Sequence, residues 1–160
     1  MDESLRTNSE NDWKIRQGSV LLVEDDAFVR EVAAEVLRAA GYRVWVAANA
    51  IEAAKMHDEQ NGCIDLLLSD MKLPGETGSA LAKKLRMRNP RLRVLLATGY
   101  GELMEDHLDG DECLAKPFSS AELLRRVKEI MGELTGKGLE IRHSHLLKDP
   151  SGGLGQSLCV

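Results

Sequence analysis

Four short apolar segments of this chain each end at a residue that can accept or bind a phosphoryl group. The segments and their end residues are 20–23 with Glu24 and Asp25, 64–69 with Asp70, 94–97 with Thr98, and 113–115 with Lys116. A carboxylate can attack a phosphorus centre, whereas a hydroxyl and an ammonium can bind the phosphoryl oxygens. Crowded carboxylates repel one another unless a cation lies between them, and Mg²⁺ is the cation expected beside carboxylates and phosphate. The residue types therefore indicate phosphoryl chemistry that depends on a divalent cation.

The elements that would position these residues can be read from the apolar pattern. Apolar runs of this length, bounded by turn residues, predict buried strands of a parallel sheet, and residues 43–47 alternate like a further strand. Helical patterns separate the strands, at 27–40, 49–59, 78–88 and 119–134. Asp26 precedes the first helix as a possible cap, and Asn49 with Glu52 and Ser119 with Glu122 match the capping-box pattern. Gly41 and Asn89-Pro90 mark the ends of the first and third helices.

Five strands alternating with helices indicate an α/β protein in which a doubly wound, five-stranded parallel sheet has helices on both faces. We expect the flavodoxin-like strand order 2-1-3-4-5, in which the first and third strands are neighbours at the switch point. Sheets of this type bind ligands at the carboxyl ends of their strands. The order therefore predicts that Asp25 and Asp70 lie together at that edge.

Composition sets the remaining expectations. The 160 residues suffice for one domain, predicted at 18–134 between a flexible leader at 1–17 and a flexible, glycine-containing tail at 135–160. A net charge of −5 argues against a nucleic-acid partner. No apolar run approaches the roughly 20 residues of a membrane span, and no segment has the pattern of a signal peptide. With three widely spaced cysteines that lack metal-ligand spacing, we expect a cytoplasmic protein without a membrane partner.

Four motifs stand at the ends of the predicted strands, namely Val20–Asp26 (VLLVEDD), Asp70–Gly75 (DMKLPG), Ala97–Gly99 (ATG) and Lys116–Phe118 (KPF). In this order they resemble the CheY-like receiver domain of two-component response regulators, over about residues 18–134. The resemblance implies that Asp70 is the phospho-acceptor, Thr98 the switch hydroxyl and Lys116 the phosphate-binding lysine. It also implies that Asp25, Asp70 and the backbone carbonyl of Lys72 coordinate Mg²⁺, with Glu24 acting mostly through water. A cis peptide bond before Pro117 is expected as well.

The function implied by this resemblance is that of a stand-alone response regulator. It would accept a phosphoryl group on Asp70 from a histidine kinase or a histidine phosphotransfer protein, with Mg²⁺ as cofactor. It would signal by protein contact, because no output domain is expected after residue 134. Its phosphorylation and dephosphorylation would be self-catalysed, so we do not expect an enzyme with an external substrate.

Two departures from the family pattern concern signal output. Cys113 stands three residues before the lysine, where the family usually has an aromatic residue, and the interval from Thr98 to Lys116 is short. We therefore expect a stunted helix in that interval and an unusual partner surface. A separate hypothesis is that Lys72 and Tyr100 slow the loss of the phosphoryl group.

Three other functions fit part of the pattern. An aspartate-nucleophile phosphatase would need an aspartate where Lys72 stands. A nucleotide-binding switch would need a glycine-rich loop where residues 24–26 are acidic. A pseudo-receiver, a scaffold that is never phosphorylated, stays open as an alternative.

Overall fold

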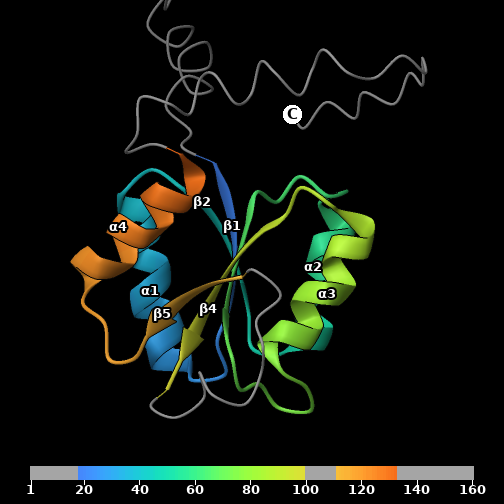
Figure 1. Ribbon diagram of the computed structural model, residues 1–160, viewed down its shortest axis with the longest axis horizontal. Coiled ribbons are helices and arrows are strands. Elements are labelled where there is room, and N and C mark those ends of the chain that lie inside the picture. Colours follow the sequence, from blue (N-terminus) through green and yellow to red (C-terminus); the bar gives the residue numbers. More distant parts are fainter. Residues whose placement is uncertain (1–17, 100–110, 133–160) are drawn as a thin grey trace, which may run out of the picture.

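The computed structural model describes residues 18–99 and 111–132, which form a parallel sheet between two pairs of helices (Figure 1). In chain order the elements are β1 (Ser19–Val23), α1 (Ala27–Ala39), β2 (Arg43–Ala47), α2 (Ala50–Glu59), β3 (Leu66–Asp70), α3 (Gly78–Arg88), β4 (Arg93–Thr98), β5 (Glu112–Ala115) and α4 (Ser120–Met131). The five strands are parallel and lie in the order β2-β1-β3-β4-β5. This order confirms the fold predicted from the sequence and makes β1 and β3 neighbours.

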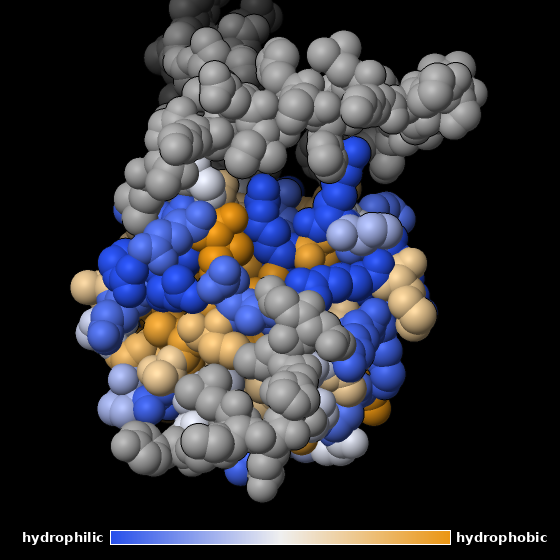
Figure 2. Space-filling model, in the orientation of Figure 1, coloured by the Kyte–Doolittle hydropathy of each residue, from blue (hydrophilic) through white to orange (hydrophobic). Residues whose placement is uncertain are grey.

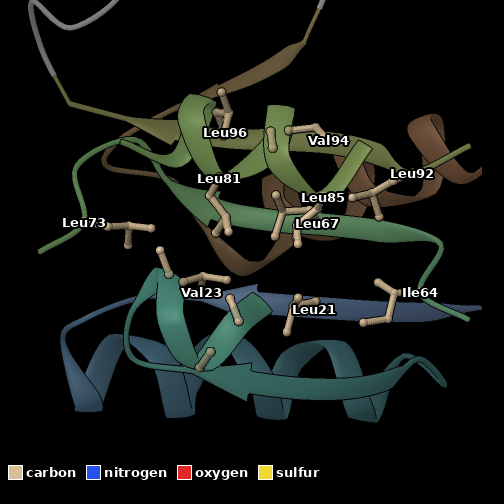
Figure 3. Packing of buried hydrophobic residues seen from close by; sticks show 14 of the residues in the cluster. Leu21, Val23, Ile64, Leu67, Leu73, Leu81, Leu85, Leu92, Val94 and Leu96 are labelled. Atoms are coloured by element: carbon tan, nitrogen blue, oxygen red, sulfur yellow. The ribbon is translucent and has the colours of Figure 1, made fainter. Parts of the chain in front are cut away.

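The sheet is buried on both faces by two apolar clusters. One cluster, between the sheet and the α2–α3 pair, contains Leu21, Leu67 and Leu81 (Figure 3). The other, on the face covered by α1 and α4, contains Leu22 and Leu37. Burying a leucine side chain contributes about 1.5–3 kcal/mol, so each cluster anchors the strands firmly. Because β1 and β3 are covered on both faces, their sequences are continuous apolar runs rather than alternating ones.

Side chains cap the starts of the predicted helices. Asp26 caps α1, Asn49 caps α2, and Ser119 with Glu122 forms a complete capping box at α4. At α2 the capping box is incomplete, because the Glu52 carboxylate accepts a hydrogen bond from the backbone N–H of Ala48 rather than from that of the cap residue Asn49. Each cap satisfies a helix N–H group that would otherwise lack a partner, which is why these starts were readable from the sequence.

Some predicted boundaries differ from the structure. The last helix ends at Met131 rather than near Leu134, because Gly132 adopts a left-handed conformation with φ of 78°. The strand predicted at 64–69 begins at Leu66 and includes Asp70 as its last residue. The predicted cis bond between Lys116 and Pro117 is present. The leader, the tail and residues 100–110, which make up most of the interval where a stunted helix is expected, lie outside the described residues.

On the face seen in Figure 2, hydrophilic residues predominate and apolar residues are exposed between them. In the part of the chain that the structure describes, the exposed large apolar side chains are Phe28, Val29, Val32, Ile51 and Met87. Within residues 18–99 and 111–132, none of the helices is long and apolar enough to cross a bilayer.

Candidate metal and phosphoryl-acceptor site

The carboxyl ends of β1 and β3 bring three carboxylates together. Val23 at the end of β1 is paired with Ser69 of β3, so Glu24 and Asp25 after one strand lie beside Asp70 at the end of the other. One carboxylate oxygen from each of the three acidic residues lies within 4.8 Å of the other two. The structure therefore places Asp25 and Asp70 together, as the strand order predicted.

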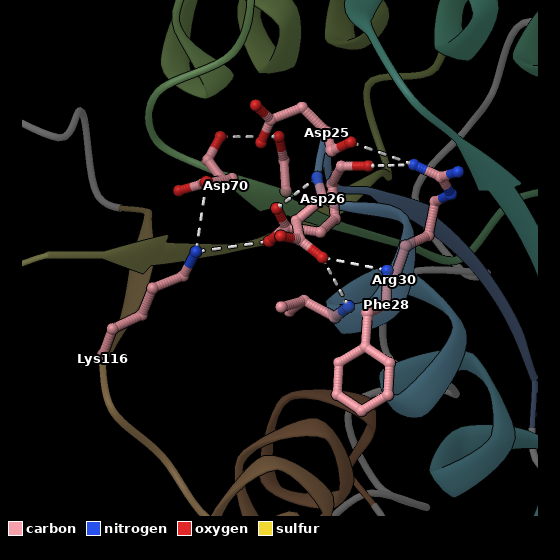
Figure 4. Close-up of polar contacts among 9 residues, drawn as sticks. Asp25, Asp26, Phe28, Arg30, Asp70 and Lys116 are labelled. Atoms are coloured by element: carbon pink, nitrogen blue, oxygen red, sulfur yellow. Dashed lines mark hydrogen bonds and ion pairs between the residues drawn. The ribbon is translucent and has the colours of Figure 1, made fainter.

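Lys116 joins this cluster from the end of β5. Its Nζ lies 3.1 Å from Oδ2 of Asp70 and 3.2 Å from Oε2 of Glu24 (Figure 4). Its backbone N–H donates to the carbonyl of Thr98 over 2.8 Å, which holds the lysine against the end of β4. Residues from four strand ends thus meet at one edge of the sheet.

The charges within the cluster perturb one another. Burial raises the pKa of Glu24 above its ordinary value of 4.5, although the N–H of Asp26 and the charge of Lys116 oppose that shift. Burial by itself disfavours the charged form of Lys116, but the hydrogen bonds and charges of Asp70 and Glu24 outweigh it and raise the pKa of the lysine. Lys116 is therefore a stable ammonium that offsets only part of the carboxylate charge.

Thr98, the last residue of β4, carries a buried hydroxyl that has no partner among the described residues. The residue has no exposed surface, and its Oγ1 makes no hydrogen bond within the part of the chain that the structure describes. A buried hydroxyl that lacks a partner is costly, so such groups often have a functional reason. A phosphoryl oxygen brought to this edge of the sheet would satisfy the Thr98 donor.

Close packing at the start of α3 fixes the backbone of Asp70. Gly78 lies so near to β3 that a Cβ atom on it would stand 2.3 Å from the carbonyl oxygen of Asp70. The same carbonyl accepts a hydrogen bond of 2.9 Å from the hydroxyl of Ser69, and the N–H of Gly78 donates to the carbonyl of Met71. This role of Gly78 was not predicted from the sequence. The only local signal was a glycine at the first position of a helix.

The neighbouring predicted residues have different surroundings. The carboxylate of Asp26 is occupied by the first N–H groups of α1 and is not part of the three-carboxylate cluster. Lys72 forms an isolated backbone bridge with Thr77, and the role of its carbonyl as a metal ligand stays a prediction. Tyr100, and with it the hypothesis on phosphoryl lifetime, lies outside the described residues.

Cys113 on β5 is a free, half-buried thiol. It packs against the apolar cluster between the sheet and α2–α3. Burial, together with the charges of Asp111 and Glu112, raises the pKa of the thiol. In this position Cys113 is a small apolar side chain of the core.

The donor set of the cluster fits a hard divalent cation. All three side chains offer carboxylate oxygens, which Mg²⁺ prefers over nitrogen and sulfur. Among the described residues, hydrogen bonds or ion pairs engage Glu24 and Asp70, while the carboxylate of the exposed Asp25 makes neither. Three carboxylates against one ammonium leave an excess of negative charge that a cation would offset.

An acidic cluster with a lysine and a buried threonine, at the carboxyl edge of a five-stranded sheet of this order, defines a class of phosphoryl-accepting signalling domains. The sequence profile of the response regulator receiver domain matches residues 20–128. The chain therefore belongs to the response regulator receiver domain family.

Three similar proteins illustrate the match. The chain is 32% identical over 116 residues to sporulation initiation phosphotransferase F of Bacillus subtilis, an alignment that covers 70% of this chain and 92% of that protein. It is 35% identical over 117 residues to sensor kinase CckA of Brucella abortus, which covers 71% of this chain but only 12% of that longer protein. Among solved structures, response regulator TrrA of Thermotoga maritima in complex with Mg²⁺ and BeF aligns with a TM-score of 0.63 at 30% identity, covering 71% of this chain and 98% of that one.

Proposed function

We propose that this chain is a Mg²⁺-dependent receiver that accepts a phosphoryl group on Asp70 from the phosphohistidine of a histidine kinase or a histidine phosphotransfer protein. The observation that carries the proposal is the position of the Asp70 carboxylate, which shares one edge of the sheet with two further carboxylates and lies 3.1 Å from the ammonium of Lys116. This is a nucleophile together with the groups that would bind its product. The similarity to a phosphotransferase and to a sensor kinase supports the two classes of donor.

In the proposed transfer, a carboxylate oxygen of Asp70 attacks the phosphorus of the phosphohistidine. The new O–P bond forms as the P–N bond breaks, and the leaving imidazole takes up a proton. Loss of the phosphoryl group follows when water attacks the same phosphorus, which releases inorganic phosphate and restores the Asp70 carboxylate. No external substrate is turned over, so we do not assign a classical enzymatic activity.

The other residues act on the charge that this reaction moves. Asp25, Asp70 and the carbonyl of Lys72 would hold Mg²⁺, with Glu24 nearby, and the bound ion would supply positive charge to the phosphoryl oxygens. Lys116 already contacts the Asp70 carboxylate and would bind an oxygen of the phosphoryl group formed there. The hydroxyl of Thr98, which has no hydrogen-bond partner among the described residues, would donate to another oxygen.

Output follows from the movement of these groups. Phosphorylation adds about −1.5 to −2 charges at neutral pH. Drawing Thr98 and Lys116 toward that charge would change the segments that follow β4 and β5. We propose that the changed surface is read by a protein partner, in the cytoplasm, without nucleic acid or a membrane taking part.

The test is phosphorylation of the full chain by acetyl phosphate, measured by intact mass spectrometry with and without Mg²⁺. Wild type should gain one phosphoryl group only with Mg²⁺, and Asp70→Asn should gain none. Asp58→Asn, the same chemical change at an exposed site on α2, is the matched control and should behave as wild type. No incorporation by wild type from acetyl phosphate or from a histidine kinase would contradict the proposal and favour the pseudo-receiver scaffold.

A further inference from the structure

Arg30 binds the backbone of the acidic turn without touching its carboxylates. This arginine lies in the first turn of α1 and reaches back toward the end of β1 (Figure 4). Its Nη1 donates to the carbonyl of Glu24 over 2.7 Å and to the carbonyl of Asp25 over 3.4 Å. Among the described residues, no ion pair joins its guanidinium to a carboxylate.

These two carbonyls belong to the peptide units on either side of the Cα atom of Asp25. Holding both units restricts the φ and ψ angles of that residue and therefore the direction in which its side chain leaves the backbone. Asp25 needs such support more than its neighbours do. Glu24 is held by the N–H of Asp26 and by Lys116, and Asp26 is held as the cap of α1, whereas the Asp25 carboxylate is exposed and engaged by nothing among the described residues.

Both bonds come from one nitrogen, Nη1, whose two N–H groups the planar guanidinium holds in fixed directions, whereas a lysine ammonium lies on a shorter, flexible stem and would hold the two carbonyls less firmly. By donating to carbonyls, Arg30 leaves the carboxylate oxygens open to a cation. Its positive charge acts in the opposite sense, since it repels a divalent ion. That repulsion is weakened by solvent at this partly exposed turn, whereas losing a group that orients a metal ligand typically weakens metal binding about 10- to 100-fold.

We propose that Arg30 is a positioning residue of the cation site, which aims the Asp25 carboxylate by bridging the carbonyls of Glu24 and Asp25. The inference rests on the proposed function, because the cation in question is the Mg²⁺ of the phosphoryl-acceptor site. It adds a residue that contacts neither the cation nor the phosphoryl group.

The experiment measures Mg²⁺ affinity of the full, unphosphorylated chain by isothermal titration calorimetry. The variants are Arg30→Met and Arg30→Lys, with Arg38→Met as the control, since Arg38 is an exposed arginine on the same helix that pairs only loosely with Glu31 at 3.7 Å. We expect the dissociation constant to rise about tenfold for Arg30→Met. We expect a smaller rise for Arg30→Lys and no change for Arg38→Met. Urea unfolding of each metal-free variant verifies that the folded state is being compared.

A second readout separates positioning from general damage. With acetyl phosphate, Arg30→Met should need about tenfold more Mg²⁺ for half-maximal phosphorylation, yet reach nearly the wild-type rate at saturation, because Asp70 and Lys116 are untouched. A lower rate at saturating Mg²⁺ with unchanged half-saturation would overturn the assignment.

The outcomes also distinguish this inference from the function on which it rests. If wild type binds Mg²⁺ and Arg30→Met binds it equally well or more tightly, the Arg30 role is wrong while the proposed function stands. Wild-type affinity in Arg30→Lys would show that an ammonium at this position suffices and would overturn the need for the fixed guanidinium geometry. If wild type itself binds no Mg²⁺, the proposed cation site and the Arg30 role are both wrong.

Discussion

Replacing Gly78 by alanine should slow phosphorylation of Asp70 far more than its effect on stability would suggest. A Cβ atom at this position would lie 2.3 Å from the backbone oxygen of Asp70 and 2.9 Å from Oγ of Ser69. The Ser69 hydroxyl can rotate away, but the Asp70 carbonyl is part of the last peptide of β3 and cannot. The acceptor residue itself must therefore move to admit the methyl group.

The size of that movement sets the expected effect. Ordinary van der Waals contact begins at 3.4 Å, so the alanine methyl and the Asp70 carbonyl must separate by about 1.1 Å more than they do now. Overpacking of this kind costs about 1–3 kcal/mol of folding free energy. A misplacement of about 1 Å at a reacting group lowers reaction rates by about 100-fold. We therefore expect Gly78→Ala to stay folded and to react about 100-fold more slowly.

The assay is the initial rate of phosphorylation by acetyl phosphate at saturating Mg²⁺, paired with urea unfolding of the same preparations. Leu85→Val is the control: it removes one buried methylene from the same helix, away from β3's carboxyl end, at a cost of about 1 kcal/mol. Leu85→Val should react at the wild-type rate. If Gly78→Ala reacts within threefold of wild type despite the stability loss, the end of β3 accommodates the methyl group and the reasoning is wrong.

Four further predictions concern buried groups and helix capping. Thr98→Val should stabilise the unphosphorylated protein by about 1 kcal/mol, because it removes a buried hydroxyl that has no partner among the described residues, and it should reduce the extra stability gained on phosphorylation. Calorimetric melting with and without acetyl phosphate measures both effects, and a less stable unphosphorylated variant would contradict the first expectation. His57→Leu should also stabilise the fold by about 1 kcal/mol, because His57 is 1% exposed and neither ring nitrogen has a hydrogen bond among the described residues. The nearby Asp58 carboxylate, 3.7 Å from Nδ1, is too far away to form one. An unchanged or lower midpoint of urea unfolding would refute this expectation. At the capping box, Ser119→Ala should cost about 1 kcal/mol. Hydrogen bonds from Ser119 hold the pKa of Glu122 below its ordinary value of 4.5, so the charged form stabilises the fold above pH 4.5 and that stabilisation is lost as pH falls through the lowered pKa. Glu122→Gln should therefore lower the free energy of unfolding at pH 7 but leave it equal to that of wild type near pH 2, as measured by urea unfolding at several pH values. A loss of stability that does not depend on pH would show that the charge of the Glu122 carboxylate is not its cause.

Much of the fold and the site was predictable because the relevant signals are local. The order of buried runs and capped helices predicted the sheet, and the residues at the strand ends predicted the cluster of Glu24, Asp25, Asp70 and Lys116. Helix ends were less predictable, as the end of α4 illustrates, because the pattern continues past Gly132 and the backbone conformation of that glycine ends the helix. The separate leader and tail, and the stand-alone organisation, stay predictions.

The sequence by itself determined which residues stand at the ends of which strands, because buried parallel strands and helix caps have recognisable local patterns. Only the tertiary structure decided how those ends meet. The contact of Lys116 with Glu24 spans 92 positions of the chain, and its 3.2 Å length depends on the packing of every strand between them. Likewise, the approach of Gly78 to Asp70 and the bridge from Arg30 to two carbonyls depend on how α3 and α1 lie against the sheet. Residue types specify the chemistry, but angstrom-scale placement comes from the packed core and cannot be read from local sequence.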